Sequence, residues 1–280
     1  MHRKVLSLLF LAVLATTQVY GQNEQGSDKS TDSNSEPTFR ELAIGAVNNF
    51  QRGDYAKAEE LASAGLLRQP QNQRLHMMLA DIRFISGNIS GAIDSYDKVI
   101  SLQPQSKPYL WQRGLALYYA EKFKEGKSQF ETHQTVNSQD VENAVWHLLC
   151  ASKVDDLESA RKKLIPIEGD TRVPMKEIYE LFAGRMKPAQ VIEVAESEQQ
   201  NQLPLYYAHL YIGLYHEMLG QKDESKSSID LAVKQSPDAK NNLMLQLARV
   251  HQQLRSPATR KESSEDEAAA KAKDDQENDK

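Results

Sequence analysis

The sequence is poor in the residues on which several classes of protein depend. Only one of its 280 residues is cysteine, which excludes a disulfide framework within the chain and a metal site built from several cysteines. Glycine and proline number 13 and 10, too few for a collagen-like or linker-dominated chain. Beyond residue 21, no apolar run reaches the roughly 18 residues that a membrane-spanning helix needs. We therefore expect no stable membrane insertion once an N-terminal leader is removed.

The sequence also lacks an excess of positive charge. It has 34 Lys and Arg against 39 Asp and Glu, a formal net charge of −5, which disfavours nucleic acid as a partner. The acidic excess lies in residues 22–37 and 256–280, and residues 38–255 are nearly neutral. The net charge therefore describes the ends of the chain and says little about a binding face.

Residues 1–21 have the pattern of a secretory signal peptide. A basic stretch at 2–4 precedes an apolar run at 5–14, and small or branched residues stand before a predicted cut after Gly21. A rival cut near Ala15 and an uncleaved anchor are the alternatives. No cysteine stands directly after the apolar run, so lipidation is not expected. The signal peptide itself predicts a periplasmic or extracellular protein.

Two segments beyond the leader have compositions typical of disorder. Residues 22–37 are rich in Ser, Asn, Asp and Gln, and residues 256–280 are a charged tail. Neither has enough apolar side chains to stabilise a packed structure. The folded part is therefore predicted to be residues 38–255.

This folded part repeats itself every 34 residues, and several columns keep the same register. The matching pairs are Ala46 and Ala80, Gly53 and Gly87, Ala58 and Ala92, and Pro70 and Pro104. A fixed period of this length is the mark of a repeat architecture in which each unit packs on its neighbours.

Each unit is predicted to be a pair of helices. Apolar residues recur at steps of three and four, as in Leu75, Met78, Leu79 and Ile82. A short turn such as Gly53–Asp54 separates the two helices, and Pro closes the unit. The small residues at positions eight and twenty are expected to face one another, so that the paired helices approach closely.

These columns resemble the tetratricopeptide repeat (TPR) family. Four units begin at Phe39, Gln73, Lys107 and Tyr206, and the matching columns are positions eight, twenty and thirty-two. Position eight holds Ala46, Ala80, Gly114 and Gly213; position twenty holds Ala58, Ala92, Gly126 and Ser225; position thirty-two holds Pro70, Pro104, Ser138 and Pro237. The resemblance implies an all-α, right-handed superhelical solenoid of about six helical pairs, with a capping helix at its C-terminal end.

The predicted solenoid has a divergent middle. Regular repeats are expected at 39–72, 73–106, 107–140 and 206–239, a divergent part at 141–205, and the capping helix at 240–255. Within the divergent part we expect helices over Val141–Val154, Leu157–Ile165, Pro174–Arg185 and Pro188–Gln199. The segment from Trp146 to Leu149 and the last unit are similar to bacterial envelope TPR lipoproteins of the NlpI type, which implies an adaptor for envelope hydrolases and proteases. The missing lipidation signal departs from that group.

In the TPR family the first helix of each pair lines a concave face. Positions two, five, nine, twelve and thirteen point into it, which makes this face the expected binding groove for a helix or peptide. The candidate groove residues are Arg40, Phe50, Arg74, Met77, Phe84, Trp111, Tyr118, Tyr119, Tyr207 and Glu217. Positions five and nine lack the Lys and Asn of the family's carboxylate clamp, so a C-terminal carboxylate ligand is disfavoured.

Catalytic patterns are weak, and we predict no catalytic residue, metal site or cofactor. His147 and Cys150 share one helix face, but two metal ligands without a second pair are too few for zinc. His216 and Glu217 do not belong to an HExxH motif, and phosphate-binding glycine loops are absent from the sequence.

Two classes of function remain. The first is a non-enzymatic adaptor for other exported proteins or peptides; the second is an enzyme or small-ligand carrier with a site in helices 141–205. A homodimer through the aromatic face is compatible with either. A groove with exposed Trp111 and Tyr119 would favour the adaptor, and a clustered polar pocket in the middle would favour the second class.

Overall fold

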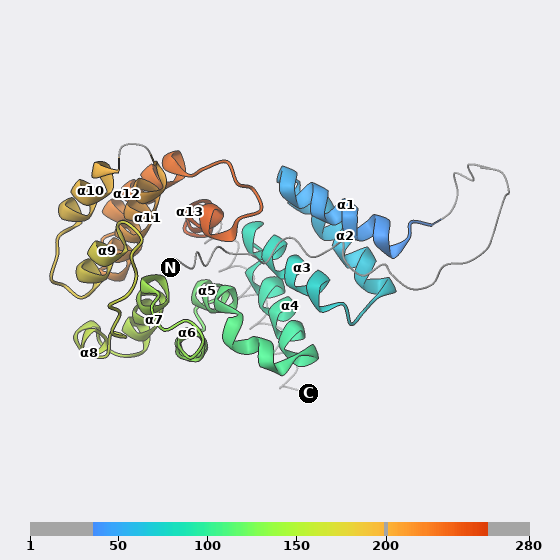
Figure 1. Cartoon of the computed structure of the whole chain (residues 1–280), viewed down its shortest axis with the longest axis horizontal. Helices are drawn as coiled ribbons and strands as arrows, with labels where there is room; N and C mark the ends of the chain where they lie inside the picture. Colours follow the sequence, from blue (N-terminus) through green and yellow to red (C-terminus); the bar gives the residue numbers. More distant parts are fainter. Residues whose placement is uncertain (1–35, 199–200, 257–280) are drawn as a thin grey trace, which may run out of the picture. The chain divides into compact units, whose positions relative to one another are not determined.

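The computed structural model describes residues 36–198 and 201–256, and the signal peptide, most of the predicted linker and the charged tail lie outside them. Within these ranges the chain forms thirteen α-helices and one 3-10 helix, and no strand. Consecutive helices pack in pairs, as Figure 1 shows for α1 with α2, α3 with α4 and α11 with α12. The prediction of six helical pairs and a final helix is confirmed, while the handedness of the stack stays a prediction.

The helices begin at the predicted residues in the first two units, but in the last unit at Leu203 instead of Tyr206. In chain order they are α1 (Phe39–Arg52), α2 (Tyr55–Arg68), α3 (Gln73–Ile85), α4 (Ile89–Leu102), η1 (Pro104–Tyr109), α5 (Trp111–Tyr119), α6 (Phe123–Gln134), α7 (Val141–Val154), α8 (Leu157–Lys162), α9 (Met175–Phe182), α10 (Pro188–Ser197), α11 (Leu203–Met218), α12 (Lys222–Gln235) and α13 (Leu243–Leu254).

Local chemistry explains where the regular helices begin and end. Thr38 and Glu41 form a capping box at the start of α1, and the side chains of Asn72 and Asn88 accept a backbone N–H at the starts of α3 and α4. Gly53 and Gly87 then take positive φ values of 82° and 88° in the turns inside units one and two.

The small residues at positions eight and twenty let the paired helices meet closely. A Cβ placed on Gly114 of α5 would lie 2.6 Å from Cζ of Phe130 on α6, and one on Gly126 would lie 3.6 Å from the carbonyl oxygen of Gly114. Gly213 faces Ile229 on α12 in the same way, at 2.7 Å. The predicted facing of positions eight and twenty is thus seen for Gly114 and Gly126, whereas Gly114 and Gly213 lie closest to the larger side chains of Phe130 and Ile229.

The third unit departs from the predicted pattern at its start. Its first helix was expected from Lys107, but α5 begins at Trp111 and is preceded by the 3-10 helix η1. Pro104 and Pro108 both lie in η1, and proline has no backbone N–H to donate within an α-helix.

The divergent middle contains the expected helices in shorter form. The helix over Val141–Val154 has the predicted bounds, but α8 ends at Lys162 instead of Ile165. The third helix ends at Phe182, close before Gly184, whose φ is 79°. Residues 163–174 form a long connection with no helix of their own. Among the described residues no helix is both long and apolar enough to cross a bilayer.

Candidate functional site

The face formed by positions two, five, nine, twelve and thirteen of the first helices, here called the inner face, is not uniformly open. The final helix α13 lies between the last pair and the first three units, as Figure 1 shows, and packs on both α12 and α3. The capping helix was expected to cover only the apolar end of the stack. Instead it also crosses the inner face.

The sequence of α13 explains why this helix is buried against the inner face. Leu243, Leu247, Ala248 and Val250 are buried, and so are the polar side chains of Gln246 and His251. Buried polar side chains need hydrogen-bond partners, and Gln246 finds one in the carbonyl oxygen of Ala239, just before α13.

The partners of the N-terminal half of α13 come from both ends of the stack. The Tyr206 hydroxyl of α11 donates to the carbonyl oxygen of Met244. The Tyr55 hydroxyl of α2 donates to the carbonyl oxygen of Lys240, just before α13, at 2.9 Å. The first and last units are thus joined through the same short segment.

The C-terminal half of α13 is held by the middle of the inner face. The Tyr119 hydroxyl lies 3.1 Å from Nδ1 of His251, and Nε of Arg255 donates to Oε1 of Glu217 at 2.5 Å. The guanidinium of Arg255 also lies 5.4 Å above the ring of Tyr119, within cation–π range. Tyr118 completes the group by donating to Oε2 of Glu217 at 2.9 Å.

The electrostatics of this group favour an ionised Glu217. Burial alone would raise the pKa of its carboxyl, but the charges of His251 and Arg255 and the hydrogen bond from Tyr118 together hold that pKa below its usual value. Burial, and then the charge of Glu217, raises the pKa of Tyr118 well above its ordinary value, so Tyr118 remains a hydrogen-bond donor.

As a result, the ten predicted groove residues separate into two rows. The covered row comprises positions twelve and thirteen, where Phe50, Phe84, Tyr118 and Tyr119 are buried and Glu217 is half-buried. The open row comprises positions two and five. It contains exposed Arg40 and Arg74 and half-buried Met77, Trp111 and Tyr207.

The condition that would have favoured the adaptor, exposure of both Trp111 and Tyr119, is therefore not met at Tyr119. Tyr119 is only 7% exposed because it packs on Phe84, Trp146 and His251. A homodimer built through these aromatic side chains would require α13 to leave. Trp111, at position five of its unit, is half-buried and keeps part of its surface accessible.

The divergent middle does contain a cluster of polar groups. Arg172, in the long connection, pairs with Asp140 at 2.7 Å, Glu142 at 2.5 Å and Asp170 at 2.6 Å. Tyr211 of α11 donates to the other oxygen of Glu142 at 2.8 Å. These groups satisfy one another and fasten residues 163–174 to the start of α7, so the cluster is structural in character.

The histidine and cysteine of α7 are also accounted for by packing. His147 is buried, and its Nε2 lies 3.3 Å from a carboxylate oxygen of Glu131. Cys150 is fully buried, and burial raises the pKa of its thiol far above the range in which a thiolate forms. Neither residue has the surroundings of a nucleophile.

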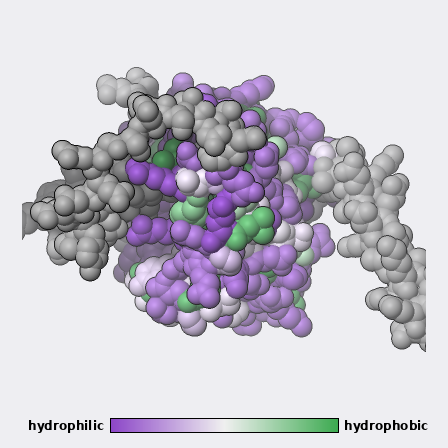
Figure 2. Space-filling model, turned by 90° about the vertical axis from the view of Figure 1, so that its right-hand side faces the viewer, coloured by the Kyte–Doolittle hydropathy of each residue, from purple (hydrophilic) through white to green (hydrophobic). Residues whose placement is uncertain are grey.

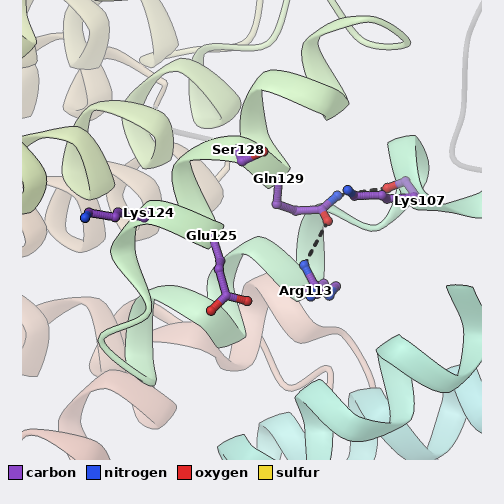
Figure 3. Close-up of a pocket in the computed structure, with 6 residues that line it drawn as sticks. All are labelled: Lys107, Arg113, Lys124, Glu125, Ser128 and Gln129. Carbon is purple, nitrogen blue, oxygen red and sulfur yellow. Dashed lines mark hydrogen bonds between the residues drawn. The ribbon is translucent and has the colours of Figure 1, made fainter.

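A surface hollow of about 280 Å³ lies between η1, α5 and α6 (Figure 3). Gln129 bridges its walls by donating to the carbonyl oxygen of Lys107 at 2.8 Å and accepting from Arg113 at 3.3 Å. Figure 3 shows Lys124 pointing away from this bonded group. The hollow is thus a shallow polar depression whose hydrogen bonds position η1.

Sequence reasoning missed the residues that divide the inner face. His251 and Arg255 could have been noticed, because they are spaced four residues apart at the end of a helix that is otherwise apolar on that side. Tyr55 and Tyr206 give no such signal, since large residues at their positions also fit ordinary helix packing. Arg172 lies outside the repeat pattern altogether.

The helix pairs define a helical-repeat protein, and comparison with known proteins finds a similar repeat family for part of the chain. The family model of the tetratricopeptide repeat matches residues 47–107. This part of the chain is therefore similar to the tetratricopeptide repeat, and proteins of that family generally mediate protein–protein interactions and are typically non-catalytic scaffolds.

Two solved structures are similar to this chain. The C-terminal part of a TPR repeat-containing protein from Cytophaga hutchinsonii is 16% identical, with a TM-score of 0.38 over 72% of this chain and 70% of that one. A tetratricopeptide repeat protein from Parabacteroides merdae ATCC 43184 is also 16% identical, with a TM-score of 0.32 over 75% of this chain and 98% of that one.

Proposed function

We propose that this protein is an exported adaptor that binds a segment of another exported protein on the open row of its inner face and performs no catalysis itself. The observation that carries the proposal is the separation of the inner face into two rows. Helix α13 bonds to Tyr119 and Glu217 of the covered row, and the open row keeps accessible surface at Arg40, Arg74, Met77, Trp111 and Tyr207.

Export is supported by the composition of residues 1–21, which is that of a signal peptide. Fusion of alkaline phosphatase after residue 37, with and without residues 1–21, tests it. Activity of the enzyme outside the cytoplasm is expected only with the leader. Equal activity of the two fusions would contradict export by this segment.

The binding site is tested by placing a photo-crosslinking amino acid at Met77, on the open row, or at Lys226, an exposed position on α12. Irradiation in the source cell is expected to attach a partner at Met77 and not at Lys226. Equal labelling at both positions would contradict a specific site on the open row.

The open row also determines which substitutions can report on binding. Tyr119→Ala would remove the partner of His251 and disturb folding, so it is unsuitable. Arg40 and Trp111 lie outside the hydrogen bonds that hold α13. Replacing them is expected to weaken capture at Met77 while the circular dichroism spectrum stays unchanged.

A further inference from the structure

Three parts of the folded chain are joined to one another in two ways. The arm, residues 39–102, comprises α1–α4; the body, the described residues of 111–235, comprises α5–α12; and the strap, residues 236–256, contains α13. The strap follows the body in sequence but returns to contact the arm. The arm is therefore tied to the body once through the chain and once through the strap.

The tie through the chain is the 3-10 helix η1. None of its residues is buried, and Pro104 and Pro108 within it have no backbone N–H to donate. Beside η1, α4 packs on α5, and Asp97 accepts a hydrogen bond from Nε of Arg113 at 2.6 Å. This junction thus has the character of a pivot with one helix contact next to it.

The strap holds the arm by neutral hydrogen bonds at the turns of units one and two. The Tyr55 hydroxyl donates to the carbonyl oxygen of Lys240 at 2.9 Å, and Nε2 of Gln253 donates to the carbonyl oxygen of Ser86 at 3.3 Å. The side chain of Lys240 also lies against Gly53, where a Cβ would be 3.2 Å from its Cγ. Packing of α13 on α3 completes this contact.

The body holds the strap through charged groups. Nε of Arg255 donates to Glu217 at 2.5 Å, and both side chains are about one-fifth exposed. Nε2 of Gln252 donates to the carboxylate of Asp230 at 2.6 Å. Hydrogen bonds to ionised groups are stronger than those between neutral groups. If one side of the strap lets go, it is therefore the arm that is released, while α13 stays on the body.

Such a movement would change the open row more than the outer surface. Figure 2 shows the molecule from the α1 end, where the visible surface is mainly hydrophilic with a small hydrophobic area among the polar groups. Polar surface of this kind stays in water whichever way the arm turns. The open row, in contrast, is divided, because Met77 belongs to the arm and Trp111 and Tyr207 belong to the body.

We propose that the strap controls the open row. With the strap closed on the arm, Met77 and Trp111 keep a fixed spacing, and a partner can contact both. When the bonds of Tyr55 and Gln253 break, the arm turns about η1 and the partner loses one of these contacts, so its apparent affinity falls with the fraction of closed molecules. This inference rests on the proposed adaptor function and adds a means of regulating it.

The movement is tested on the whole protein without a partner. Spin labels on cysteines that replace Lys98 of α4 and Lys226 of α12, both exposed, report the distance between arm and body, and the native Cys150 is too buried to be labelled. Tyr55→Phe with Gln253→Glu removes both donors and is expected to lower the ratio of closed to open molecules roughly tenfold or more. Double electron–electron resonance should then show a second distance. A distance distribution identical to that of the wild type would overturn the proposal.

The matched control makes the same two chemical changes elsewhere. Tyr109→Phe with Gln71→Glu alters exposed positions that the strap's hydrogen bonds do not involve. It is expected to keep the single wild-type distance. The same second distance in this control would overturn a specific role for the strap.

Control of the open row is tested by photo-crosslinking at Met77 in the source cell. The strap variant is expected to capture less than half as much partner as the control variant. If the arm opens in the strap variant and capture is undiminished, the proposed control is wrong and the adaptor function stands. If Met77 captures no partner in the wild type either, the adaptor function fails, and control of the open row fails with it.

Discussion

At the scale of single residues, the glycines of the repeat are required for different structural reasons. Gly114 permits contact between α5 and α6, because a Cβ there would lie 2.6 Å from Phe130. Gly53 and Gly87 instead provide the positive φ of a turn. The same residue type is therefore required by packing in one column and by backbone conformation in another.

Gly114→Ala is expected to destabilise the protein by about 1–3 kcal/mol, since the added methyl group must displace the ring of buried Phe130. Gly45→Ala is the matched control, also inside a helix, where the nearest atom is a methyl of Leu61 at 3.0 Å. It should be neutral or stabilising by up to about 1 kcal/mol. Urea unfolding measures both, and equal effects of the two variants would contradict this account.

Glu121 occupies the turn of the third unit, where units one, two and six have Gly53, Gly87 and Gly220. Its φ of 58° is strained for a residue with a Cβ. Glu121→Gly is therefore expected to stabilise the protein by about 0.5–1 kcal/mol and to raise Tm by a few degrees. A lower Tm in thermal unfolding would show that Glu121 makes a compensating interaction.

Asp81 provides a test that depends on pH. It lies partly buried at position nine, its Oδ1 accepts a hydrogen bond from Tyr96 at 2.6 Å, and burial raises the pKa of its carboxyl to about 7. A carboxyl whose pKa is higher in the folded state than in the unfolded state contributes less stability as the pH rises between the two values.

The wild-type protein is therefore expected to lose stability from Asp81 between about pH 4 and pH 7. Asp81→Asn removes this titration, so the Tm difference between variant and wild type should increase by several degrees from pH 5 to pH 8. Asp94→Asn, at an exposed position on α4, is the control. A difference in Tm that does not change with pH would contradict the raised pKa.

At the scale of elements, helix α13 determines what the inner face can do. Bonds from α13 and the residues at its two ends reach α2, the end of α3, α5 and α11, so this segment joins units that a stack of repeats would otherwise keep apart. Among these contacts the pair of Arg255 and Glu217 is the most directly testable, because both side chains are only about one-fifth exposed, at 21% and 19%.

Glu217→Gln is expected to destabilise the protein by about 1–3 kcal/mol, because it leaves Arg255 half-buried without its counter-charge. Hydrogen exchange should show the loss mainly as faster exchange in α13. Glu224→Gln, at an exposed position in the first turn of α12, is the matched control. Uniform loss of protection over all helices would contradict a local role for this pair.

The wild-type contribution of Glu217 has the opposite pH dependence to that of Asp81. A depressed carboxyl pKa stabilises the folded state at neutral pH, and this stability is lost as the pH falls through the folded-state pKa. Glu217→Gln should therefore approach the wild-type stability at acidic pH.

The sequence was most informative about the regular elements. The 34-residue columns, with their small residues and turn glycines, correctly predicted the helix pairs because each unit depends on local periodicity and neighbour contacts. The shortened α5 was not predicted, although Pro108 marks the place where an α-helix cannot form. The bounds of α8 and α9 were also imprecise, since the long connection after α8 carries no periodic signal.

The candidate site was predicted only in part. The ten residues were chosen by their position in the repeat, which places them on one face but does not say what else occupies it. Tyr119 and Glu217 are covered because His251 and Arg255 bond to them from more than a hundred and about forty residues later in the chain. Contacts at such separations leave no periodic trace in one sequence.

At the scale of the whole molecule, we assign separate roles to the two rows of the inner face. The contacts of α13 with the covered row join the described repeats, and we propose the open row as the surface for a partner. A partner on the open row should therefore bind while α13 keeps its contacts. Displacement of α13 would instead make the covered row the binding site.

Hydrogen exchange of the protein, alone and with a partner captured by crosslinking at Met77, tests this division most directly. Slower exchange is expected in α1 and α3, which carry Arg40, Arg74 and Met77, with the exchange of α13 unchanged. Faster exchange in α13 on binding, with no protection of α1 and α3, would contradict the account.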